Sequence, residues 1–247
     1  MISAFRVEIC IGLLLSAIGS HAQPLLEPQP QPAPCDLEGG KKLMWGDKDP
    51  EKRQTGLSQI RCSAEAGNLE AQVYLATLLD AGIGMPQDTR QAAQWLERAA
   101  EKRYPPAMSR LAFAYLNGVG VQPDRDKART LLTEAAALGE SQAMANLGAM
   151  YGRGDGVPQS DRIAAEWYQK AADRGSPNGQ LGLANMLMRG HGVSQDYSRC
   201  FFYASLAAKT NFPPAVNVAK QCEQRLSTDE RARVVEQVQQ WKPLPLN

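Results

Sequence analysis

Two stretches of the chain, 69–81 and 89–102, place their apolar residues with the period of an α-helix. In each stretch the apolar residues named below recur on one face of the helix. We therefore predict two amphipathic helices joined by a short turn. The residues expected on the buried faces are Ala71, Leu75, Ala76 and Leu79 in the first helix and Ala92, Trp95, Leu96 and Ala99 in the second.

This helix pair recurs along the chain without insertions. The dipeptide Ala99–Ala100 returns, at a constant step of 36 residues, as Ala135–Ala136, Ala171–Ala172 and Ala207–Ala208. One helix pair cannot bury its apolar face alone, whereas a stack of such pairs forms a continuous core. The sequence therefore predicts an all-α fold, namely a solenoid of stacked helix-turn-helix repeats.

Two further columns of the repeat are expected to set the helix ends. Glycine tolerates the positive φ of a tight helix exit, and it follows the first helix at Gly82, Gly118, Gly154 and Gly190. Side chains that can accept hydrogen bonds from free helix N–H groups precede the second helix, at Asp88, Asp124, Ser160 and Asp196. We read these columns as C-caps and N-caps.

The repeats leave extra segments at both ends of the chain. Ser227 and Glu230 form a capping-box pattern that predicts a final helix. The expected organisation is a signal peptide at 1–22, a Pro-rich spacer at 23–35, a degenerate N-terminal repeat or cap at 36–66, four repeats at 67–102, 103–138, 139–174 and 175–210, and a C-terminal half-repeat with a capping helix at 211–247.

The N-terminus has the features of an export signal. Arg6 precedes a short apolar run over 9–18, and Ser20 and Ala22 are small residues at the two positions that a signal peptidase inspects. We predict cleavage after Ala22 and a periplasmic or secreted protein. An uncleaved anchor is the alternative, although the run is shorter than the roughly 20 residues of a membrane span.

Cleavage there would leave the cysteines Cys35, Cys62, Cys200 and Cys222. An even number of cysteines in an oxidising compartment favours disulfides, with three possible connectivities. Proximity in the sequence favours Cys35–Cys62 and Cys200–Cys222, one bond at each end of the array. Four small buried thiols are the alternative.

Charge and motifs exclude several classes of function. The 247 residues carry a formal net charge of +1, so no excess positive field would attract nucleic acid. The sequence contains no Ser-x-x-Lys, Gly-x-Ser-x-Gly or phosphate-loop motif. The one histidine beyond the signal, His191, lies in a turn without metal-ligand partners nearby in the sequence. We therefore expect no enzyme activity, no metal and no cofactor.

The third repeat shows the full pattern in order: Ala143, Leu147, Gly148, Tyr151, Gly154, Gly156, Val157, Ala164, Trp167, Ala171, Ala172 and Gly175. This pattern resembles Sel1-like repeats, which are relatives of tetratricopeptide repeats. The resemblance implies an α/α superhelical solenoid that serves as an adaptor for protein–protein interaction, often outside the bacterial cytoplasm. Some secreted family members are linked to penicillin binding and weak β-lactamase activity, but they carry a cysteine pair in every repeat.

In a solenoid of this type, the stripe of the first helix opposite the core lines the concave face. Here that stripe holds three Arg, five Asn or Gln, two aromatic residues and one carboxylate. Such side chains can bind an extended peptide or a terminal carboxylate, although an ordinary solvated surface is the alternative. The predicted partner-binding residues are Tyr74, Arg110, Phe113, Asn117, Asn146, Arg153, Asn185 and Arg189.

We therefore expect an exported interaction scaffold that binds a protein or peptide partner through its concave face, with no nucleic acid and no membrane span after signal cleavage. One alternative is a binder or weak hydrolase of peptidoglycan or β-lactam-type ligands. Another is a structural subunit of a cell-envelope machine, for which charge changes on the convex face, such as at Glu166 or Lys170, would disrupt assembly more than changes in the groove.

Overall fold

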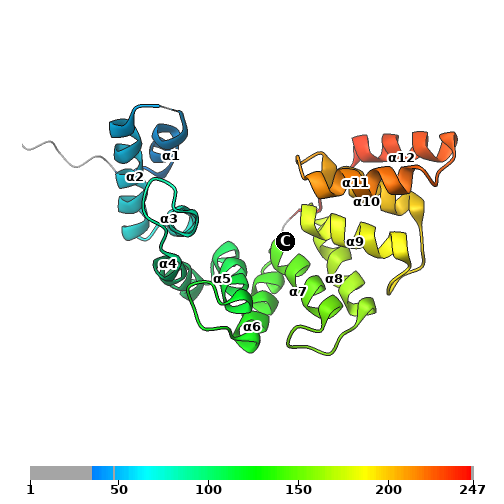
Figure 1. Ribbon diagram of the computed structural model, residues 1–247, viewed down its shortest axis with the longest axis horizontal. Coiled ribbons are helices and arrows are strands. Elements are labelled where there is room, and N and C mark those ends of the chain that lie inside the picture. The colour runs from blue at the N-terminus through cyan, green and yellow to red at the C-terminus, as the bar shows by residue number, and fades with distance from the viewer. Residues whose placement is uncertain (1–34, 47, 246–247) are drawn as a thin grey trace, which may run out of the picture. The chain divides into compact units, whose positions relative to one another are not determined.

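A computed structural model describes residues 35–46 and 48–245, and every regular element in this part of the chain is an α-helix (Figure 1). The predicted all-α architecture is confirmed. The expected signal peptide, and the spacer apart from Cys35, lie outside the described residues. The helices are α1 (Leu37–Gly46), α2 (Pro50–Glu65), α3 (Leu69–Ala81), α4 (Thr89–Glu101), α5 (Pro105–Asn117), α6 (Arg125–Ala137), α7 (Ser141–Arg153), α8 (Asp161–Asp173), α9 (Pro177–Arg189), α10 (Tyr197–Ala208), α11 (Pro213–Glu223) and α12 (Thr228–Gln240).

Both predicted kinds of cap are present. Gly82 follows α3 in the left-handed region, with a φ of 66°, and its N–H donates to the Leu78 carbonyl. The Asp88 side chain accepts a hydrogen bond from the Gln91 N–H at 2.9 Å, which caps α4. The same arrangement recurs in the later repeats at Gly118, Gly154 and Gly190 and at Asp124, Ser160 and Asp196.

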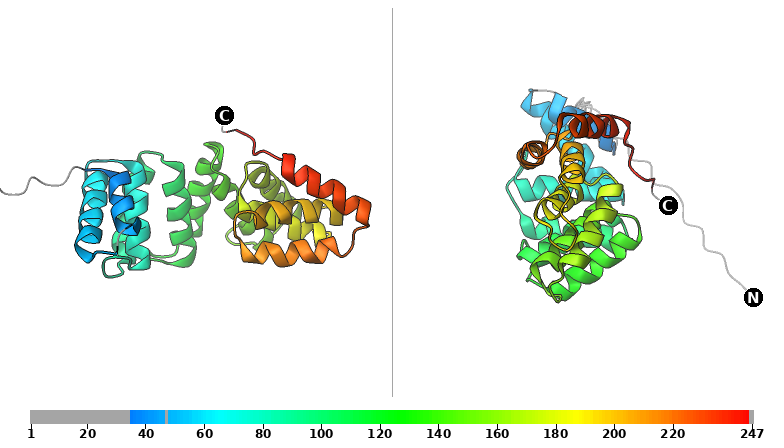
Figure 2. Two further views of the ribbon diagram at one scale, coloured as in Figure 1. Left: turned by 90° about the horizontal axis from the view of Figure 1, so that it is seen from above. Right: turned by 90° about the vertical axis from the view of Figure 1, so that its right-hand side faces the viewer.

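The predicted apolar stripes form the core. In the first repeat Ala71 and Ala99 have no exposed surface, and Leu75 is 1% exposed. The small alanines let paired helices approach closely, while each buried large side chain contributes about 1.5–3 kcal/mol relative to an exposed one. From α1 to α11 each helix packs on the next one along the chain, whereas α12 packs on α10, so that hairpin stacks on hairpin along the array (Figure 2).

Covalent bonds tie the helices at both ends. Cys35, which precedes α1, is joined to Cys62 of α2. Cys200 of α10 is joined to Cys222 of α11. These are the pairings that sequence proximity favours, and the four cysteines are therefore not free thiols in this structure.

The chain continues beyond α12 and returns to the turn between α8 and α9. The Leu244 N–H donates to the Asp173 carbonyl at 2.8 Å, and the Trp241 and Pro243 side chains lie beside Gly175. A segment at the end of the sequence thus contacts an earlier part of the array. None of the helices in the described ranges is both long enough and apolar enough to cross a membrane.

Candidate functional site

A groove with a volume of about 750 Å³ crosses the first helices of the four repeats, α3, α5, α7 and α9, with side chains of α4 and α8 in its walls. We call it the central groove. Four residues predicted to bind a partner line it together, namely Arg110, Phe113, Asn146 and Asn185. They come from three different repeats, so only the stacking of the repeats brings them into one site.

Arg110 is the cation of the groove, and it is held in place by α3. Its Nη1 donates to Thr77 Oγ1 at 2.9 Å, and this hydroxyl donates to the Val73 carbonyl at 2.9 Å. The bond to Thr77 orients the guanidinium and uses one of its five N–H donors. The remaining donors can form charge-assisted hydrogen bonds with a ligand oxygen.

Amide side chains connect α9 and α7 across the groove. Asn178 Nδ2 donates to Gln142 Oε1 at 2.8 Å, and Gln142 Nε2 donates to Asn146 Oδ1 at 3.0 Å. This amide ladder leaves the Asn146 NH2 group as a donor at one end and the Asn178 carbonyl as an acceptor at the other. An extended peptide backbone offers the same alternation of acceptors and donors.

Tyr168 of α8 contributes an aromatic ring to the wall of the central groove, although it was not among the residues predicted to bind a partner. Its ring fits against two helix-interior glycines: a Cβ on Gly182 would lie 2.5 Å from a ring carbon, and a Cβ on Gly148 would lie 2.8 Å from one. Burial raises the pKa of the Tyr168 hydroxyl, and the positive charge of Arg153 opposes this shift. Glycine within a helix is unfavourable, so these two glycines were the sequence signal for a close neighbour.

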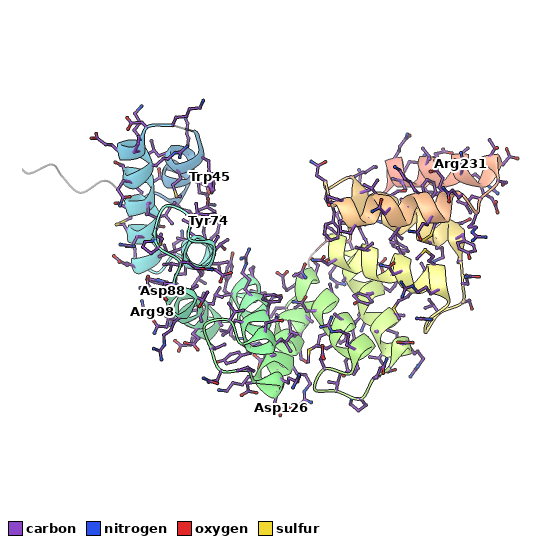
Figure 3. All side chains as sticks on the ribbon, in the orientation of Figure 1. Trp45, Tyr74, Asp88, Arg98, Asp126 and Arg231 are labelled. Carbon is purple, nitrogen blue, oxygen red and sulfur yellow. A yellow bond between two sulfur atoms is a disulfide. The ribbon has the colours of Figure 1, made fainter. Side chains whose placement is uncertain are left out.

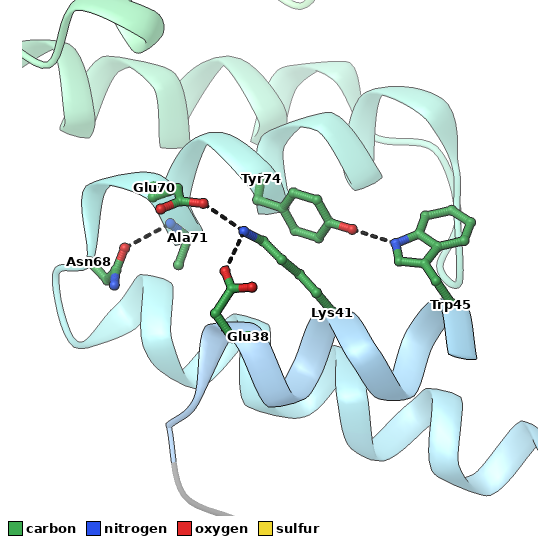
Figure 4. A network of polar contacts seen from close by, with 7 residues as sticks. All are labelled: Glu38, Lys41, Trp45, Asn68, Glu70, Ala71 and Tyr74. Atoms are coloured by element: carbon green, nitrogen blue, oxygen red, sulfur yellow. Dashed lines mark hydrogen bonds and ion pairs between the residues drawn. The ribbon is translucent and has the colours of Figure 1, made fainter. Parts of the chain in front are cut away.

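Tyr74 is not part of the central groove, because α1 occupies its side chain (Figure 4). The Trp45 Nε1–H donates to the Tyr74 hydroxyl. Lys41 lies 5.1 Å from the centre of the Tyr74 ring and forms ion pairs with Glu38 and Glu70, at 2.7 and 2.6 Å. Figure 3 labels the two residues on α1 and α3. These contacts dock α1 onto α3.

The other three predicted residues differ in position. Asn117 donates to the carbonyl of its own helix at Phe113, at 2.8 Å, and does not line the groove. Arg153 pairs with Asp155 at 2.6 Å and also lies outside the lining. Arg189 lines a smaller hollow of about 210 Å³, which shares Asn185 and the Tyr168 ring with the central groove and so continues it.

The charge of the central groove is therefore nearly balanced. Among the described residues that line it, Arg110 is the cation and Asp80 the carboxylate. Phe113 is 56% exposed there, which is a large exposure for an aromatic ring. The described residues contain no cluster of three or more potential metal ligands. The site can offer hydrogen bonds, one directed cation and an apolar contact, which are the means of binding an extended chain.

The comparisons with known proteins agree with this architecture. A family model of the Sel1 repeat matches the chain at four consecutive stretches that together make up more than half of it: 69–104, 105–140, 141–176 and 177–211. No curated protein sequence matches the chain.

Several solved structures are similar to it, among them the following two. A protective antigen of uropathogenic Escherichia coli with an SLR fold is 30% identical, with a TM-score of 0.62; the alignment covers 81% of this chain and 43% of the antigen, so this chain spans less than half of that protein's length. A Sel1 repeat protein from Oxalobacter formigenes is 22% identical, with a TM-score of 0.68, over 85% of this chain and 86% of that one. By its four matched repeats and its fold, the chain belongs to the Sel1 repeat family.

Proposed function

We propose that this Sel1 repeat protein is an exported interaction scaffold that binds an extended segment of a partner protein in the central groove. Sel1 repeat proteins commonly act as protein-interaction scaffolds. The observation that carries the proposal is the set of oriented polar groups in the groove, where Arg110 and the amide ladder present donors and acceptors from consecutive repeats.

The chemistry of the groove favours a peptide backbone as the ligand. A strongly anionic ligand would be served by several unpaired cations, whereas the groove balances Arg110 against Asp80. The exposed Phe113 ring adds an anchor for one apolar side chain of the ligand. In this proposal Asn146 and Asn185 bind the backbone, Arg110 binds a carbonyl or a carboxylate, and Arg189 contacts the ligand where the groove continues.

Export is the second part of the proposal. It is supported by the predicted signal at 1–22 and by the two disulfides, because disulfides persist in oxidising compartments such as the bacterial periplasm. Sequencing the N-terminus of the protein recovered from the periplasm or the medium tests this part. We expect the mature chain to begin at Gln23, and a chain that retains Met1 in the cytoplasm would contradict export.

Site-specific photo-crosslinking in cells of the source organism tests the groove. A photoreactive residue replaces Asn146 in one variant and Glu166, an exposed residue on α8, in another. We expect a defined adduct with a partner protein from position 146 and none from position 166. Adducts from position 166 alone would instead indicate a partner held by the opposite surface.

A second substitution in the variant with the photoreactive residue at position 146 tests whether the adduct depends on the groove. Arg110→Ala should weaken binding of the partner by about 5- to 150-fold, since a charge-assisted hydrogen bond contributes roughly 1–3 kcal/mol. The matched control is Arg162→Ala, which removes an arginine that pairs with Glu166 on the surface of α8. Loss of the adduct with Arg110→Ala but not with Arg162→Ala supports the proposal. Equal adducts in both variants would refute it.

A further inference from the structure

The second helix of three repeats carries a large aromatic side chain at the same column. These residues are Trp95 of α4, Trp167 of α8 and Tyr203 of α10. In α6 the column holds Leu131, which is partly buried. The second repeat therefore lacks the aromatic ring that the repeats before and after it carry on their second helices, α4 and α8.

Two of these rings are covered by a cation three residues later on the same helix. The guanidinium carbon of Arg98 lies 4.6 Å from the centre of the Trp95 ring, and Lys170 Nζ lies 4.4 Å from the centre of the Trp167 ring. The corresponding residue of α6 is Glu134. The second repeat thus lacks the cation as well as the ring and has a carboxylate instead.

The missing ring coincides with a larger opening in the surface. A hollow of about 600 Å³ lies beside Leu131, between α4 and α6. The equivalent hollow one repeat earlier, beside Trp95 and between α2 and α4, has about 300 Å³. The two hollows are lined by matching columns, since Glu97 corresponds to Arg61 of the earlier one. We call the larger one the α4–α6 hollow.

Apolar side chains form the base of the α4–α6 hollow. Met108 and Leu111 are almost completely buried, and Leu131 and Tyr115 are half-buried above them. The Tyr115 hydroxyl donates to Glu97 Oε1 at 3.3 Å, which fixes the edge of its ring. Such a lining favours a flat apolar group, because an aromatic ring would restore the contacts that Trp95 makes one repeat earlier.

The rim of this hollow is acidic. Four carboxylates line it, from Glu97, Glu101, Asp126 and Glu134, against one cation, Lys127. Asp126 projects from α6 in Figure 3 and is paired with an arginine of its own helix. Glu101 and Glu134 form no ion pair or hydrogen bond through their side chains with the described residues. Their charges are therefore available to a cation from outside.

We propose that the α4–α6 hollow binds an aromatic side chain and an adjacent Lys or Arg of a partner protein. The ring would occupy the space beside Leu131, and the cation would pair with Glu101 and Glu134. The partner would thus supply from outside the ring-and-cation pair that α4 and α8 carry themselves. The hollow shares no lining residue with the central groove, so this inference does not rest on the proposed function.

Two small probes of opposite charge test the site in the purified full chain. The probes are 5-fluorotryptamine, an indole with an ammonium group, and 5-fluoroindole-3-acetate, an indole with a carboxylate. Titrations are followed by ¹⁹F NMR. We expect saturable binding of the tryptamine at least fivefold tighter than that of the acetate, because the acidic rim attracts the first probe and repels the second.

The decisive variant is Leu131→Trp, which introduces the side chain that repeats one and three have at this column. Filling the hollow should weaken tryptamine binding at least tenfold. Leu138→Trp is the matched control, since Leu138 is 41% exposed beyond the end of α6 and does not line the hollow. The double variant Glu101→Gln/Glu134→Gln should weaken tryptamine binding at least fivefold without changing the volume of the site.

Several results would overturn the inference. Unchanged tryptamine affinity in Leu131→Trp would mean that the probe binds elsewhere, for instance beside Phe113 in the central groove. Equal affinities for the two probes, or no saturable binding of either, would overturn it as well. If Leu131→Trp loses its helical circular dichroism signal, the variant Glu101→Gln/Glu134→Gln provides the test instead. An unchanged affinity of this double variant for the tryptamine would refute the proposal.

Discussion

The contact between neighbouring repeats at Gly120 leads to a sharp prediction about stability. A Cβ on Gly120 would lie 2.1 Å from the carbonyl oxygen of Thr89, at the start of α4. Gly84 occupies the same column one repeat earlier, with a φ of 74° against 71° at Gly120. A Cβ there would meet only side-chain atoms of Met44 and Leu57, at 3.4 and 3.8 Å. The substitutions Gly120→Ala and Gly84→Ala therefore share the backbone strain and differ in the clash.

The expected magnitudes follow from these two terms. An alanine in the left-handed region costs about 1–2 kcal/mol, and both variants should lose this amount of unfolding free energy. Forcing the turn away from α4 should cost Gly120→Ala about 1–3 kcal/mol more, as in other overpacked sites. We thus expect a loss of about 1–2 kcal/mol for Gly84→Ala and about 2–5 kcal/mol for Gly120→Ala.

Urea unfolding followed by circular dichroism measures the difference between the two variants. Because stability in a repeat array is approximately a sum of repeat and interface terms, amide hydrogen exchange should place the extra loss at α4 and the turn after α5. Equal unfolding midpoints for the two variants would show that this turn moves aside without cost. The reasoning that the turn glycines permit repeats to stack would then be wrong.

Two further predictions concern the ends of the array. Removing the C-terminal disulfide with Cys200→Ala/Cys222→Ala should destabilise α10–α12 by about 3 kcal/mol, the value for a loop of this length, and hydrogen exchange should localise the loss there. Hydrogen bonds to Glu38 and Glu70 raise the pKa of Lys41 above its ordinary 10.5. A raised lysine pKa gives stability that is complete below pH 10.5 and disappears as the pH rises through the higher, folded value. The difference in urea midpoint between the protein and Lys41→Met should therefore be present near pH 9 and vanish in stronger alkali.

Each of these two measurements has its own check. Lys42→Met, which removes the neighbouring, exposed lysine of α1, is the matched control for Lys41→Met. For the disulfide variant, an increase in the rate of amide hydrogen exchange that is as large in α5–α7 as in α10–α12 would contradict a local effect.

The repeating elements of this fold were readable from the sequence because local geometry determines them. The period of the apolar residues predicted both ends of α3 correctly. For α4 it predicted the correct start and an end one residue too late. The cap columns at Gly82 and Asp88 were equally clear, since caps depend on residues close together in the chain. The same apolar and cap positions recur in all four repeats, so each repeat tests the assignment independently.

The composition of the groove was less predictable, because it depends on contacts between repeats that break the period. Tyr74 belongs to the right column, but Trp45 of α1 binds it, and no 36-residue step connects these two residues. Arg153 likewise has the right position and pairs with Asp155 in the following turn. Tyr168 was missed because its column holds leucine in the first two repeats, and only the fit against Gly182 shows why the ring is there.

The placement of the two disulfides has a consequence for how the protein matures. Both bonds lie outside the span from α3 to α9, whose side chains form the central groove. In a one-dimensional stack each unit is stabilised by its immediate neighbours, so a bond at either end acts chiefly against fraying of that end. The middle of the array, which contains the central groove, can therefore fold before any oxidant has acted, and oxidation then fixes the two ends of an array that is already folded.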